Sequence, residues 1–150
     1  MRVIYVDIET RSRVSLKNLG VYKYVECPDF RILMAAWAQD DGEVHMALGH
    51  DEILAIPGLL DPNIDKVAHN AQFERVCLGT LVESLRDPAQ WIDTAAIAAE
   101  HGYPISLDAA SKALKVTQKD SAGSKLIKLF TVPNRDGSWN DETTHPMEWL

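Results

Sequence analysis

The stretch Arg2–Ile8 reads RVIYVDI and is followed directly by Glu9 and Thr10. Its Val, Ile and Tyr residues are typical of a buried strand, so we expect this strand to lie at the centre of a sheet. Side chains alternate between the two faces of a strand, which places Asp7 and Glu9 on one face, together with Tyr5. Two carboxylates at a strand end can bind hard divalent cations. A solvated strand end has the same Asp-x-Glu pattern, so the pair alone leaves both readings open.

Outward from this strand, the sequence predicts a mixed sheet. Residues 31–39 (RILMAAWAQ) form the expected second strand, and Asp40-Asp41-Gly42 is a hairpin signal that leads to a third strand over 43–48. Shorter strands are expected over 66–69 and 90–92. The first strand should pair with residues 31–39 in antiparallel fashion, which makes the first three strands an antiparallel meander.

Helices are expected between and after these strands. Their predicted ranges are 52–60 with Asp51 as cap, 71–82, 93–101 with Asp93 as cap, 106–114 with Ser106 as cap, and 121–130. Residues 10–15 and 131–146 are rich in polar residues or turn formers and are expected to be loops. Helices that alternate with short strands predict an α/β fold with a mixed sheet, within one domain over residues 1–150.

Composition excludes several classes of protein. The chain is 46% hydrophobic and 25% charged, as in ordinary globular domains. Its two cysteines match no zinc-binding spacing, and no signal peptide or membrane-spanning run is visible, so we expect a cytoplasmic protein without membrane contact. A net charge of −7 argues against a protein that coats nucleic acid. It is compatible with a nuclease, because bound divalent cations reverse the field of their carboxylate ligands.

A second polar motif occurs where the strand over 66–69 leads into a helix. It runs from His69 to Glu74 and reads HNAQFE. Asn70 and Glu74 are four residues apart, so a continuous helix would place them on one face, and Phe73 would pack inward. A helix that Asn70 caps accounts for the same residues. A role of His69 in hydrogen bonding within the fold likewise competes with a contact to phosphate.

Together, the two motifs make the sequence resemble the RNase H-like 3′→5′ exonucleases, the proofreading domains of family A DNA polymerases. The first family motif, Asp-x-Glu, corresponds to Asp7-Ile8-Glu9, and the second corresponds to the segment Asn70–Glu74. The segments Gly20–Tyr24, Val67–Asn70 and Gln118-Lys119-Asp120 resemble the phage and prophage branch. This resemblance covers essentially the whole chain.

The resemblance implies a two-metal hydrolysis of the phosphodiester at the 3′ end of single-stranded DNA. Asp7, Glu9 and Glu74 would be the catalytic carboxylates and would hold two Mg²⁺ or Mn²⁺ ions. Asn70, Phe73 and His69 would bind the substrate. The expected partners are a single-stranded DNA 3′ end and the polymerase domain of a parent chain, in the cytoplasm of a bacterium that carries the phage or prophage.

The sequence departs from the family in two places. The second motif ends in Glu74, where the family usually has Asp. The third family motif, Tyr-x3-Asp or His-x4-Asp, does not occur, and the segment 146–150 resembles the start of the helix that would carry it. We therefore expect a domain truncated before its third motif, with weak or no activity. An inactive DNA-binding or structural remnant, and an RNase H-like nuclease that acts on RNA, are the alternatives.

Overall fold

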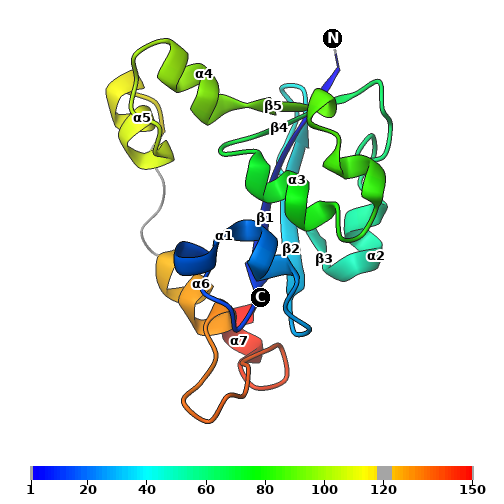
Figure 1. The fold of residues 1–150 in the computed structure, drawn as a ribbon, viewed down its shortest axis with the longest axis vertical. Coiled ribbons are helices and arrows are strands. Elements are labelled where there is room, and N and C mark those ends of the chain that lie inside the picture. Colours follow the sequence, from blue (N-terminus) through cyan, green and yellow to red (C-terminus); the bar gives the residue numbers. More distant parts are fainter. Residues whose placement is uncertain (1, 118–122, 150) are drawn as a thin grey trace. The chain divides into compact units, whose positions relative to one another are not determined.

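The computed structural model describes residues 2–117 and 123–149 (Figure 1). The segment Gln118-Lys119-Asp120 and the first two residues of the helix predicted over 121–130 lie outside these described residues. The chain divides into two compact units, and each is described by itself. The first comprises Met1–Ile8 and Ile32–Lys119, and the second comprises Glu9–Arg31 and Asp120–Leu150.

The first unit is built on a five-stranded sheet with the order β3-β2-β1-β4-β5. The strands are β1 (Val3–Arg11), β2 (Arg31–Gln39), β3 (His45–Leu48), β4 (Asp65–Ala68) and β5 (Trp91–Asp93). β1 is therefore central and is the neighbour of β2, as the sequence predicts. The predicted range of the first strand, 2–8, was too short, because β1 continues through the polar residues Glu9, Thr10 and Arg11.

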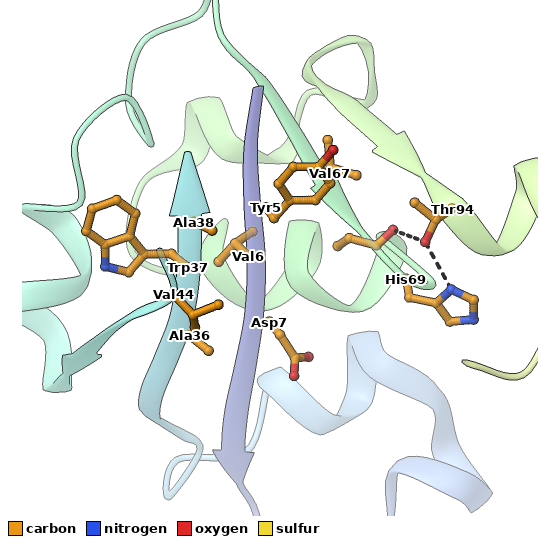
Figure 2. A pocket seen from close by; sticks show the side chains of 11 residues that line it. Tyr5, Val6, Asp7, Ala36, Trp37, Ala38, Val44, Val67, His69 and Thr94 are labelled. Carbon is orange, nitrogen blue, oxygen red and sulfur yellow. Dashed lines mark hydrogen bonds between the residues drawn. The ribbon is translucent and has the colours of Figure 1, made fainter. Parts of the chain in front are cut away.

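Strand directions agree with the expected mixed sheet. β2 pairs with β3 in antiparallel fashion, and β4 pairs in parallel with β1 and with β5. Figure 2 shows β1 and β2 running in opposite directions. The turn between β2 and β3 is closed by Gly42, whose backbone N–H donates to the carbonyl of Gln39 at 2.9 Å. The fold class is thus the predicted one, an α/β architecture consistent with the RNase H-like fold.

One face of the sheet forms the core of this unit. On β1, Ile4, Val6 and Ile8 are buried, as the alternation of the strand requires. The helices α2 (Gly49–Leu54) and α3 (Gln72–Leu78) add buried apolar residues, among them Ile53 and Leu78. This packing holds the beginning of α3 near the end of β4, where the site lies.

Two helix predictions were wrong in their limits. α2 begins at Gly49 and ends at Leu54, so Asp51 lies in its first turn and is not its cap. The helix ends early because Pro57 disfavours a helical conformation at the residue before it. α3 ends at Leu78, four residues before the predicted end. It is followed by two 3-10 turns, Glu83–Arg86 and Pro88–Gln90.

Two further helices follow β5 in the first unit, and both begin where the sequence predicts a cap. α4 (Thr94–Glu100) has Asp93 as its N-cap, and α5 (Leu107–Leu114) has Ser106. In each case the side chain accepts a hydrogen bond from a backbone N–H of the first turn. Asp93 thereby becomes the last residue of β5 and the cap of α4 at once.

The second unit contains the end of β1 and the helices α1 (Leu16–Val25), α6 (Gly123–Thr131) and α7 (Pro146–Trp149). Tyr24 lies in its core, where its hydroxyl is 2.9 Å from Thr10 Oγ1 and its ring contacts Phe30 edge to face. The sequence does not predict α1, because Gly20 interrupts it with a positive φ of 77° and breaks the helical period. None of the helices in the described residues combines the length and the hydrophobicity that a membrane-spanning segment requires.

Candidate functional site

The parallel strands bring three segments of the first unit to one edge of the sheet. Tyr5 on β1 is level with Val67 on β4, and Ala68 on β4 is level with Asp93 on β5. Asp7 is therefore at the same edge as the residues that follow the carboxyl ends of β4 and β5. In open α/β sheets, ligands bind outside such carboxyl ends, which makes this edge the place to look for chemistry.

Glu74 is the most unusual side chain at this edge. It lies in the first turn of α3 and is only 4% exposed, and its Oε2 atom is buried without a hydrogen-bond partner among the described residues. Burial raises the pKa of its carboxyl to about 8, and the negative charges of Asp7 and Asp93 contribute to that shift. Asp7 and Asp93 must therefore be close enough for their charges to act on Glu74.

The turn that leads into α3 differs from the predicted helix. Asn70 has a left-handed backbone with φ of 67°, and the N-cap of α3 is Ala71. Asn70 therefore neither caps the helix nor shares a helical face with Glu74, and the argument from four-residue spacing was wrong. The backbone N–H of Asn70 donates to Asp93 Oδ1 at 2.9 Å, which ties this turn to the end of β5.

His69 is held by hydrogen bonds at both ring nitrogens. Its Nδ1 is 3.0 Å from Thr94 Oγ1, and its Nε2 is 2.8 Å from the carbonyl oxygen of Ile105, to which Nε2 donates. Figure 2 shows this side chain beside Thr94, at the same edge as Asp7. Phe73 is half-buried, so its ring is only partly packed into the core.

Glu9 lies two residues beyond Asp7 on β1, in the part of the strand that belongs to the second unit. By the alternation of the strand it faces the same way as Asp7 and Tyr5. Within the described residues, no three His, Cys, Asp or Glu side chains are gathered closely enough to form a ready metal site. The predicted convergence of Asp7, Glu9 and Glu74 therefore remains a prediction.

A hollow of about 270 Å³ lies on the sheet beside Asp7 (Figure 2). Its walls are mainly apolar: Tyr5, Val6, Asp7, Ala36, Trp37, Ala38, Val44, Val67, Ala68, His69 and Thr94. Tyr5 is 46% exposed there, and Trp37 is half-buried and stacks on His45 with ring centroids 4.7 Å apart. The sequence analysis did not predict this hollow. The one feature of the sequence that pointed to it was the alternation of the first strand, which places Tyr5 and Asp7 on the same face.

The chemistry of these residues fits a hard divalent cation. Carboxylate oxygens are the ligands that Mg²⁺ and Mn²⁺ prefer. Glu74 supplies a buried oxygen without a partner, and Asp7 supplies a negative charge close to it. A cation that these two carboxylates shared would remove the repulsion between them and lower the pKa of Glu74.

Comparison with known proteins relates the chain to a viral polymerase. No protein-family model matches it. It is 43% identical over 141 residues to a protein named DNA polymerase from Bacillus phage SP02, and the match covers 89% of this chain. The chain spans only 21% of the length of that relative. It is thus similar to one part of a phage DNA polymerase.

Proposed function

We propose that this chain is the 3′→5′ exonuclease domain of a phage-type DNA polymerase and acts in proofreading. One observation supports this most strongly. Glu74 is a buried carboxylate with a partnerless oxygen, and it lies near Asp7 where the parallel strands end. In a chain similar to a phage DNA polymerase, such a pair of acids suits the binding of metal ions for phosphodiester hydrolysis.

In this proposal Asp7, Glu9 and Glu74 hold Mg²⁺ or Mn²⁺. Bound ions would activate the attacking water and stabilise the leaving 3′ oxygen. The protein's own task is to orient these carboxylates. β1 places Asp7 and Glu9, and the first turn of α3 places Glu74, from which a bound cation would displace the proton that burial favours.

The substrate in this proposal is the 3′ end of single-stranded DNA. Asn70 is exposed and Phe73 is half-buried, so both can contact a nucleotide at the edge of the sheet. His69 is fixed by Thr94 and Ile105, and its contribution is to shape the path of the strand. A polymerase domain in the same polypeptide is the proposed partner, which would deliver a frayed primer end.

The test is a nuclease assay on 5′-labelled single-stranded DNA in Mg²⁺ and in Mn²⁺. We expect little or no cleavage by the 150-residue chain, because a family-type third motif is absent from its sequence. A polypeptide extended through that motif should shorten the DNA from its 3′ end, and Asp7→Ala should abolish this activity. Asp51→Ala, which changes an exposed aspartate of α2, is the matched control.

Three outcomes would contradict the proposal. Cleavage that begins at the 5′ end would exclude the proposed polarity. A clear preference for RNA would favour the alternative RNase H-like nuclease. Full activity of Asp7→Ala in the extended polypeptide would show that β1 does not carry the catalytic acid.

A further inference from the structure

Asp93 connects two junctions of the first unit through a single carboxylate oxygen. Its Oδ1 accepts a hydrogen bond from the backbone N–H of Asn70 at 2.9 Å, and another from that of Ala95 at 2.9 Å. The first donor belongs to the turn between β4 and α3, and the second to the first turn of α4. Hydrogen bonds to a charged acceptor are among the stronger ones in proteins.

Besides Asp93, the turn at Asn70 is held by the backbone N–H of Phe73, which donates to the carbonyl oxygen of Asn70 at 3.0 Å. Its left-handed backbone, with φ of 67°, is unfavourable for residues other than glycine, although Asn tolerates it better than most. Ala71 provides no side-chain cap for α3, a helix of only seven residues. Glu74 lies in the first turn of that helix, so the position of its carboxylate depends on the geometry of the turn.

We propose that Asp93 is a positioning residue for Glu74: by clamping the backbone of Asn70, it fixes the start of α3 and thereby the place of the Glu74 carboxylate. The proposal rests on the proposed function, in which Glu74 is a metal ligand. Thr94 supports the same clamp, since its Oγ1 is 3.3 Å from the carbonyl oxygen of Ala68 and 3.0 Å from His69. Asp93 acts through the backbone, and it need not touch a metal ion.

The chain offers a matched control in Asp87. Its Oδ1 also accepts a backbone N–H at 2.9 Å, from Ala89, and it caps the 3-10 turn Pro88–Gln90. Asp87 therefore makes the same kind of cap, and its hydrogen bond to Ala89 stays within its own 3-10 turn. Loss of an ordinary cap should destabilise the protein to a similar extent in either place.

The experiment compares Asp93→Ala, Asp93→Asn and Asp87→Ala in the 150-residue chain. Asp93→Asn keeps an oxygen that can accept both N–H groups, whereas Asp93→Ala keeps none. The loss of a charge-assisted hydrogen bond changes an equilibrium constant by a factor of about ten or more. Asp93→Ala should therefore raise the exchange rate of the Asn70 amide about tenfold. It should raise the dissociation constant for Mn²⁺ by a similar factor. Asp93→Asn should restore most of both, and Asp87→Ala should change neither.

A third measurement separates this proposal from the proposed function. The Glu74 carboxyl carbon resonance, recorded at pH 5 without metal, should move in Asp93→Ala and return in Asp93→Asn. If the wild-type chain binds no Mn²⁺, the metal site is refuted, while this resonance still tests the positioning. An unmoved resonance in Asp93→Ala would overturn the proposal, and so would Asp93→Asn behaving like Asp93→Ala.

Discussion

Replacement of Glu74 by glutamine should make the protein more stable in alkaline solution. Burial, reinforced by Asp7 and Asp93, raises the pKa of Glu74 from 4.5 to about 8. The native state therefore favours the neutral acid, while the unfolded chain ionises it near pH 4.5. Below that pH both states are protonated and the stability is fully present. It is lost as the pH rises toward 8, where the native carboxyl also ionises.

The size of this loss follows from the two pKa values. They differ by about 3.5, and each unit corresponds to about 1.4 kcal/mol, which gives an upper limit of roughly 5 kcal/mol. That is a large share of the roughly 5–15 kcal/mol by which domains are stable. Glu74→Gln keeps the shape of the side chain and cannot ionise, so its stability should lack this component of the pH dependence.

The assay is urea denaturation with EDTA at pH 5 and at pH 9. Wild type and Glu74→Gln should have similar free energies of unfolding at pH 5, and the variant should be several kcal/mol more stable at pH 9. Glu100→Gln, which changes an exposed glutamate of α4, serves as the control and should follow wild type. Replacing EDTA with Mg²⁺ at pH 9 should stabilise wild type but not Glu74→Gln. A difference in unfolding free energy between wild type and Glu74→Gln that is the same at both pH values would show that ionisation of Glu74 is not its cause.

Three other experiments test smaller parts of the structure. Burial raises the pKa of the Cys77 thiol, so a thiol reagent at pH 8 should label Cys77 only after unfolding and the half-exposed Cys27 quickly. Equal labelling rates of the two cysteines would contradict the packing of α3. Asn70→Ala should lower the free energy of unfolding by roughly 1 kcal/mol, because alanine tolerates the left-handed φ of this position poorly, and Asn70→Gly should lower it less. The reverse order in thermal unfolding would show that the backbone of this turn relaxes in the variant. Gly79→Ala should destabilise the protein by about 1–3 kcal/mol, since the new Cβ would lie 2.8 Å from the carbonyl oxygen of Arg75. An unchanged melting temperature would count against this close contact.

The framework of the fold could be predicted because local patterns and tertiary packing agree there. The apolar run of Arg2–Ile8 indicates a central strand, and the turn at Gly42 indicates the hairpin. The caps at Asp93 and Ser106 were visible because short polar side chains satisfy backbone N–H groups at helix starts. These features depend on near neighbours in the sequence.

What could not be predicted depends on contacts between distant residues. Thr10 continues β1 with its side chain buried against the hydroxyl of Tyr24, although the polar segment that begins at this residue suggests a loop. Asn70 leaves the helix because Asp93, 23 residues later, holds its N–H. The burial of Glu74 likewise has no local signal, since an acidic residue in the first turn of a helix is ordinarily exposed.

In the proposed function, Asp7, Glu9 and Glu74 share one divalent-cation site, which a Mn²⁺ titration of the ¹³C-labelled chain can detect. The paramagnetic ion broadens the carboxyl resonances of its ligands first. The signals of these three residues should disappear at substoichiometric Mn²⁺, while the exposed acids Asp51 and Glu100 stay sharp. Broadening that begins at the exposed acids, or that spares Glu74, would exclude the shared site.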